Sequence, residues 1–227
     1  MNPPPSAAVP LALRCLAAAA SLVVLPVHAN LLVNGSFEAG SFTPDVHGVQ
    51  DLGIGAPGPL PLAGWTLFVG DVFWVGNGNT YGIAASDGVR SMSLYDPFRP
   101  LVRVGSVQQT IASTIGTAYE LSFDVGASAS FPGTTGMRVQ AAGQSADFYN
   151  RGGNGWQHHT WSFTAIDTST VVYFVGLAGD GYIGLDNAVL TAAAVPEPAT
   201  AALLSAGLGL ALLRRRSVAG QADGATS

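Results

Sequence analysis

The sequence contains no lysine, a single cysteine and few charged residues of either sign. Charged residues make up 10% of the 227, against about 25% in an average soluble domain. The cationic residues are nine arginines against 14 acidic residues, and a net charge of -5 excludes the basic surface that nucleic-acid-binding proteins need. One cysteine excludes an internal disulfide. With 48% hydrophobic residues and 20 aromatic ones, the composition also excludes disorder.

Neither end of the chain has a long apolar run, but each has a short one. At the N-terminus, Arg14 precedes an apolar stretch over 15–25, which is too short to cross a bilayer as a helix. A small-residue pattern ending at Ala29 follows it. This order is typical of a secretory signal peptide over 1–29, so we expect a mature protein that begins at Asn30 and has no cysteine.

The C-terminal region has three parts in a fixed order. They are the triplet Pro196, Glu197 and Pro198, an uncharged run over 199–213, and the cluster Arg214, Arg215 and Arg216. This order resembles the PEP-CTERM sorting signal of Gram-negative bacteria, predicted here over 195–216 with a polar tail over 217–227. The resemblance implies processing by an exosortase, often alongside exopolysaccharide production.

The arginine cluster also predicts orientation. Cationic residues favour the cytoplasmic side of a membrane, so a transmembrane helix over 199–213 would place the preceding domain outside the cytoplasm. Fifteen residues form a helix of about 22 Å, so the proline-rich start must share the crossing. We expect transient anchoring in the inner membrane.

The segment 30–194 contains every aromatic residue and reads as one all-β domain. Alternating apolar and polar residues predict half-buried strands over 106–111, 119–125 and 158–163. The stretch 171–175 is apolar at every position, which predicts a central strand covered on both faces. A last strand is expected over 182–190.

Two stretches rich in glycine, 40–64 and 76–88, do not fit strands. Loops of this length are usually functional or mobile, and we expect both at one end of the sandwich.

Short motifs in this domain recur in the same order in one known group. They are residues 30–38, 64–65, 91–94, 107–110, 119–123 and 184–189. The domain resembles the DUF642 family and related galactose-binding-like proteins, which implies a jelly-roll β-sandwich and a kinship with carbohydrate-binding modules. Because fold alone does not fix function, the ligand has to be argued from residues.

Sugar binding is the first predicted chemistry, because sugar rings stack on exposed aromatic side chains ringed by polar groups. The candidate residues are Trp74, Tyr81, Tyr95, Arg99, Asn150 and Trp156. Trp156 follows a glycine-rich loop that could present its ring to solvent. The alternative for each aromatic residue is packing in the core or at its rim.

A structural Ca²⁺ ion is the second predicted chemistry. The resemblance to jelly-roll modules implies that Glu38 and Asp186 stand where related modules hold a cation, and carboxylate oxygens suit Ca²⁺. The alternative is that Glu38 caps a turn and Asp186 bonds backbone amides.

Catalysis and zinc binding have little support in the sequence. Successive strand residues point to opposite faces, so His158 and His159 cannot easily share an ion. The sequence has no motif for a serine nucleophile, a zinc protease or a phosphate loop. Paired aspartates of a glycosidase, drawn from Asp45, Asp51, Asp71, Asp87 or Asp96, remain an alternative.

We therefore expect an exported, non-catalytic protein that reaches the cell surface or the extracellular matrix. It would bind carbohydrate within an exopolysaccharide layer or biofilm. Its expected partners are an exosortase, a polysaccharide or other matrix component, and transiently the inner membrane. The rival interpretations are a structural or adhesive matrix protein without a sugar site, and a glycan-active enzyme.

Overall fold

The computed structural model describes residues 29–53, 60–95, 104–178 and 181–193, which form strands and no helix. The first strands are β1 (Val49–Asp51), β2 (Thr66–Leu67), β3 (Phe73–Gly76), β4 (Arg90–Ser93) and β5 (Ser106–Ala112). The longer ones follow: β6 (Ala118–Ala127), β7 (Thr135–Ala141), β8 (Gln144–Asn150), β9 (Gly155–Thr164), β10 (Ser169–Ala178) and β11 (Gly184–Ala192).

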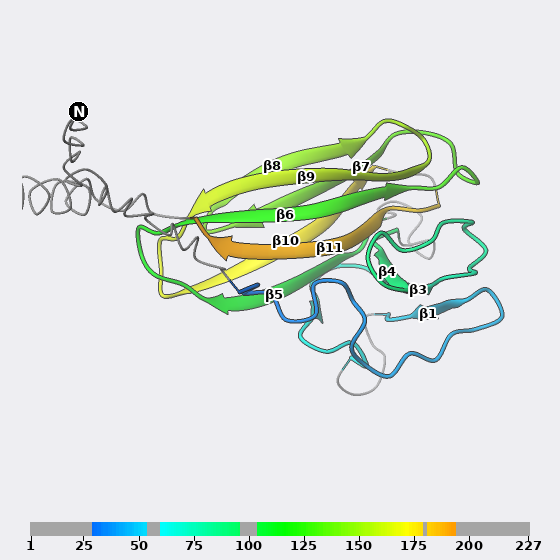
Figure 1. The fold of residues 1–227 in the computed structure, drawn as a ribbon, viewed down its shortest axis with the longest axis horizontal. Coiled ribbons are helices and arrows are strands. Elements are labelled where there is room, and N and C mark those ends of the chain that lie inside the picture. Colours follow the sequence, from blue (N-terminus) through cyan, green and yellow to red (C-terminus); the bar gives the residue numbers. More distant parts are fainter. Residues whose placement is uncertain (1–28, 54–59, 96–103, 179–180, 194–227) are drawn as a thin grey trace, which may run out of the picture.

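The strands form two antiparallel sheets packed face to face (Figure 1). One sheet has the order β1-β3-β4-β11-β6-β9 and the other β2-β5-β10-β7-β8. From β4 onward the chain passes repeatedly from one sheet to the other. Among the strands of the described ranges, β3 and β4, and β7 and β8, are neighbours in both sequence and space. This connectivity is a jelly roll, so the predicted fold class is confirmed.

The main core lies between the two sheets and is built from alternating strand residues. In β6, Leu121, Phe123 and Val125 are fully buried. Phe123 contacts Phe174 of β10 across the sandwich, with ring centroids 5.4 Å apart. The centroid of the Trp65 ring lies 5.9 Å from that of Phe174. The period of two in the sequence therefore marks the inward face, as expected for a half-buried strand.

A second, smaller apolar cluster lies on the opposite face of the six-stranded sheet. Its buried members are Val49, Phe73, Val75, Ile83 and Tyr182. In β3 they alternate with Trp74, which belongs to the main core. The loop 77–89, which joins β3 to β4, contributes Ile83 and covers this part of the sheet. The predicted loop over 76–88 is thus confirmed, while 40–64 contains the short strand β1.

The predicted strands are confirmed, with one difference in their surroundings. β10 lies in the middle of its sheet, as its apolar sequence indicates. However, Val171, Tyr173 and Val175 are only half-buried, because none of the strands in the described ranges forms a third layer over the outer face of the five-stranded sheet. The expectation that both faces of β10 are covered was wrong.

Several predictions lie outside the described residues: the signal peptide up to residue 28, the apolar segment 199–213 and the polar tail 217–227. Within the described ranges, no helix combines the length and the hydropathy that a membrane crossing requires.

Candidate functional site

The outer face of the five-stranded sheet presents a row of aligned side chains. Thr66 of β2 lies opposite Gln108 of β5, and Gln108 lies opposite Tyr173 of β10. The row continues to Gln140 of β7 and ends at Ser145 of β8. Residues directly opposite one another in a sheet have Cβ atoms about 5 Å apart. The five side chains therefore form one uncharged band across all five strands, which we call the polar row.

Tyr173 of the polar row forms an aromatic pair with Phe68. Phe68, which directly follows β2, keeps 54% of its surface exposed. Its ring contacts the ring of Tyr173 edge to face, with centroids 5.1 Å apart at an interplanar angle of 66°. An exposed phenylalanine and a half-exposed tyrosine together offer an apolar surface beside hydrogen-bonding groups.

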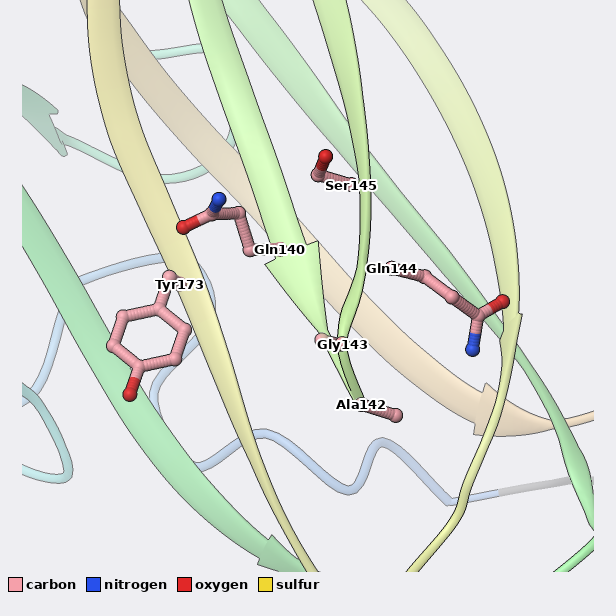
Figure 2. A pocket seen from close by; sticks show the side chains of 7 residues that line it. Gln140, Ala142, Gly143, Gln144, Ser145 and Tyr173 are labelled. Carbon is pink, nitrogen blue, oxygen red and sulfur yellow. The ribbon is translucent and has the colours of Figure 1, made fainter.

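A shallow pocket of about 230 Å³ lies at one end of the row. Its lining is formed by Gln140, Ala141, Ala142, Gly143, Gln144, Ser145 and Tyr173. Figure 2 shows Tyr173, Gln140 and Ser145 on three neighbouring strands, beside the turn formed by Ala142 and Gly143. The pocket is thus bounded by the tyrosine ring, the side-chain amides of two glutamines and the serine hydroxyl group, with no charged side chain in its lining.

The charged residues near the polar row pair with each other. Arg138 of β7 donates to both carboxylate oxygens of Asp147 in β8, at 2.6 and 2.9 Å. The hydrogen bond with Arg138 lowers the pKa of the Asp147 carboxyl below its ordinary value. Arg151 lies over the ring of Tyr149, 5.5 Å from its centroid. Arg138 and Asp147 therefore neutralise each other, while the charge of Arg151 lies against an aromatic ring.

One acceptor in the polar row is unused. The side-chain oxygen Oε1 of Gln108 is buried and has no hydrogen-bond partner among the described residues. A buried polar atom without a partner costs free energy, and such atoms are uncommon in native structures. Gln108 therefore places an unpaired acceptor just beneath the surface of the polar row.

Three of the predicted sugar-binding residues are core residues instead. Trp74 has no exposed surface, and its indole N–H donates to the Phe37 carbonyl at 2.8 Å. Tyr95 is 7% exposed and Asn150 is 3% exposed. The Asn150 side chain donates to two backbone carbonyls, those of Val125 and Gly155. The prediction that these residues face a ligand is corrected, because the sandwich and its loops cover them.

Tyr81 and Trp156 are half-buried and belong to the second apolar cluster. The Trp156 ring lies directly over Gly126, where an added Cβ atom would come within 2.6 Å of it. Its indole N–H donates to the carbonyl of Ala84 at 2.8 Å. Burial raises the pKa of Tyr81 above its ordinary value. Both rings hold the loop 77–89 against the sheet. The sixth predicted sugar-binding residue, Arg99, lies outside the described residues.

The two predicted calcium ligands meet at one loop but use its amides. Glu38 Oε1 accepts from the backbone N–H groups of Val89 and Arg90, each at 2.7 Å. Asp186 Oδ2 accepts from Ser86 at 2.8 Å and from Asp87 at 3.0 Å. This is the alternative that the sequence left open, in which both carboxylates fix a turn.

Asp186 stands in an unusual electrostatic setting. It is fully buried and lies opposite Asp124 on the neighbouring strand β6. Burial raises the pKa of the Asp186 carboxyl to about 7. Asp124 is bound in turn by the side chains of Asn187 at 3.2 Å and His158 at 2.7 Å. A carboxyl that is partly protonated near neutral pH is a weak cation ligand, since ligands must be deprotonated.

Calcium binding therefore stays a prediction. Within the described ranges, no cluster of three or more His, Cys, Asp or Glu side chains is arranged to hold a metal. If Ca²⁺ binds to Glu38 and Asp186, EDTA is expected to lower the melting temperature of the purified protein, because a ligand that binds the native state stabilises that state. An unchanged melting temperature and no copurifying metal would contradict the prediction.

The two adjacent histidines point to opposite faces, as predicted. His158 is 56% exposed and bonds Asp124 on the outer face of the six-stranded sheet. His159 packs between the rings of Phe123 and Phe148, at 6.0 and 5.3 Å. Its Nε2 atom is buried and lacks a hydrogen-bond partner among the described residues.

The burial of His159 predicts a loss of stability in acid. Burial, with a smaller effect from neighbouring His158, lowers the pKa of His159 below its ordinary value of 6.5. Below that pH the unfolded chain takes up a proton that the folded chain resists, so stability falls as the pH drops. We expect His159→Gln to flatten the dependence of the melting temperature on pH between about 7 and 5. Phe148→Leu, which disturbs the same contact without removing a titrating group, should keep the wild-type dependence. Equal slopes in all three proteins would contradict this.

Comparisons with known proteins identify two parts of the chain. A family model described as "Protein of unknown function (DUF642)" matches residues 30–181. The PEP-CTERM protein-sorting motif matches residues 194–217, which include the predicted triplet and arginine cluster. The motif marks the chain as a secreted, extracytoplasmic protein. No curated protein matches the sequence at a significant level.

Solved structures with a similar arrangement of strands include three carbohydrate-binding modules. One is described as "CBM4 structure and function", with 15% identity, a TM-score of 0.43, and coverage of 71% of this chain and 99% of that one. TmCBM61 in complex with beta-1,4-galactotriose has 14% identity, a TM-score of 0.43, and coverage of 72% and 99%. A family 35 module from Clostridium thermocellum has 18% identity, a TM-score of 0.37, and coverage of 57% and 89%.

Proposed function

Because the chain belongs to the DUF642 family, whose function is unknown, we propose a function from the site alone: binding of a neutral polysaccharide outside the cell. The observation that carries the proposal is the open outer face of the five-stranded sheet. There an aromatic pair lies beside a row of uncharged hydrogen-bonding side chains.

The chemistry of this face suits a sugar chain better than other ligands. A pyranose ring has apolar C–H faces and a rim of hydroxyl groups. Phe68 and Tyr173 supply apolar surface for the former, and the amides of Gln108 and Gln140 can donate to and accept from the latter. The charges of Arg138 and Asp147 are already paired, so an acidic or basic ligand would find no free partner in them.

We propose that the protein is not an enzyme. The two buried acidic residues that face each other, Asp124 and Asp186, are occupied by hydrogen bonds. They lie in the six-stranded sheet, away from the open face. A glycosidase would need two carboxyl groups on either side of a bound sugar. Release of reducing ends from a polysaccharide by the purified chain would contradict this proposal.

The proposed setting is an exopolysaccharide layer or biofilm of a Gram-negative bacterium. A signal peptide would start export, and an exosortase would process the C-terminal motif after transient anchoring in the inner membrane. The motif match over 194–217 supports the sorting step. A purely structural matrix protein remains the rival, in which Phe68 and Tyr173 only pack.

Electrophoresis in gels that contain polysaccharide tests the proposal. The full chain is expected to migrate more slowly in gels with a neutral β-linked glucan, galactan or mannan than in plain gels. An anionic polysaccharide such as alginate should slow it less, because Arg138 is already paired with Asp147. Equal mobility in every gel, including one with the producer's own exopolysaccharide, would favour the structural rival.

A further inference from the structure

One end of the sandwich carries two protruding isoleucines. Ile115 lies in the turn between β5 and β6 and is 63% exposed, and Ile166 lies in the turn between β9 and β10 and is 68% exposed. The two turns are bonded side by side, since the N–H of Gly116 donates to the carbonyl of Ala165 at 2.8 Å. Both side chains therefore extend from the same small surface, which we call the isoleucine end.

The described chain both begins and ends at the isoleucine end. The N–H of Ala193 donates to the carbonyl of Ala118, the first residue of β6, at 2.8 Å. The N–H of Leu31 donates to the carbonyl of Leu190, near the end of β11, at 2.8 Å. Figure 1 shows that β11 terminates at the same end as the β5–β6 and β9–β10 turns. The chain thus leaves the sandwich toward its sorting motif beside Ile115 and Ile166.

The apolar segment 199–213 begins only six residues after Ala193. Six peptide steps reach at most about 20 Å even when fully extended. If that segment sits in a membrane, as the proposed function requires, the isoleucine end must lie close to the bilayer surface.

The charge distribution agrees with this placement. The two turns, 113–117 and 165–168, contain a single charged residue, Asp167. Its carboxylate accepts a hydrogen bond from the N–H of Thr168 at 2.6 Å. At the opposite end, the loops around β3 and β4 carry Glu38, Asp45, Asp87 and Arg90. A tip with two exposed isoleucines and one charged residue can approach lipid headgroups at a lower desolvation cost than the charged opposite end.

We propose that Ile115 and Ile166 rest in the interface of the bilayer that holds the C-terminal segment. Two side chains bury too little surface to bind a membrane alone, so the contact depends on the segment 199–213 and ends when that segment is cut. The contact orients the sandwich with its strands rising from the membrane. The open face of the five-stranded sheet then points sideways, where a polysaccharide can reach it.

Site-directed fluorescence on the full chain tests this orientation. The chain is placed in phosphatidylcholine vesicles that contain a lipid-borne nitroxide quencher. A polarity-sensitive fluorophore is attached at Ile115→Cys or Ile166→Cys, in a Cys15→Ser background that removes the native cysteine. The matched controls are Val46→Cys and Val89→Cys, which are 94% and 53% exposed and lie in loops near β1 and β4.

The expected result is quenching at positions 115 and 166 that is several-fold stronger than at 46 and 89, with a blue shift of emission. Equal quenching at all four positions would overturn the proposal, and so would a chain that does not float with the vesicles. Polysaccharide binding is measured on the same labelled proteins in detergent, so a failed membrane contact is distinguishable from a failed sugar site. Without residues 195–227, quenching at 115 and 166 should disappear.

Discussion

Replacing Trp74 by alanine is expected to lower the free energy of unfolding by about 3–5 kcal/mol, the usual cost of truncating a buried tryptophan. Trp74 has no exposed surface, and its ring contacts Phe42 at 5.0 Å between centroids. The guanidinium group of Arg90 lies 5.1 Å from the centroid of the Trp74 ring. Truncation would leave a cavity and would also leave the Phe37 carbonyl without its donor. Denaturant titration followed by circular dichroism measures the loss.

Two variants make this experiment specific. Trp74→Phe keeps most of the ring but removes the indole donor, so it should cost clearly less than alanine. Trp156→Ala truncates a half-buried tryptophan on the other face of the same sheet and should also cost less. A loss below about 1 kcal/mol for Trp74→Ala would show that the site is not packed as described, because even small buried truncations cost that much.

The fold was predictable because several long strands begin with an alternation of covered and exposed residues. In β6, the alternation of Leu121 and Phe123 with Ser122 and Asp124 marks the inward side, and the register of the sheet follows from it. The positions of the loops followed from their glycine and proline content. The jelly-roll arrangement was implied by family resemblance rather than by periodicity, since pairing over long separations leaves no local signal.

The burial of Trp74 was not predictable from its own neighbours. The run Phe73, Trp74 and Val75 is apolar at every position, which shows that both faces of β3 are covered. The run does not show which elements cover the two faces of β3. Trp74 faces the main core, whereas Phe73 and Val75 face the loop 77–89. Trp74 is therefore enclosed between the two sheets, where no sugar ring could stack on it.

For β10 the sequence led to the opposite error, because burial was expected on both faces. The candidate site on its outer face was therefore missed. Its apolar run was interpreted as covered on both faces, yet Val171, Tyr173 and Val175 are half-exposed. In a two-layer sandwich each sheet covers one face of the other, so an apolar run whose second face no loop covers signals an exposed apolar surface. Such surfaces commonly mark interaction sites. The tyrosine within that run was the available clue.

The roles of Glu38 and Asp186 depended on atoms that the sequence does not place. Their convergence on one loop agrees with the expectation that both belong to one site. That the loop turns its backbone N–H groups toward both carboxylates is a matter of local geometry. The same two residue types could serve a cation or a turn.

Removing the aromatic pair is expected to weaken polysaccharide binding by about 10- to 100-fold, since each ring contributes roughly 1 kcal/mol and 1.4 kcal/mol corresponds to a factor of ten. Phe68 is exposed and Tyr173 half-buried, so the variant Phe68→Ala/Tyr173→Ala should stay folded. Tyr81→Ala serves as the control. It removes a sequence-predicted sugar ligand that packs against Phe131 and Tyr182 instead, so it should bind as wild type does.

The most direct test is the dissociation constant of a retained neutral polysaccharide for wild type, Phe68→Ala/Tyr173→Ala and Tyr81→Ala, measured by isothermal titration. Sugar binding on the open face of the five-stranded sheet predicts a large increase in the constant for the double variant and none for Tyr81→Ala. Unchanged binding by a folded double variant, or a loss confined to Tyr81→Ala, would contradict the proposed site.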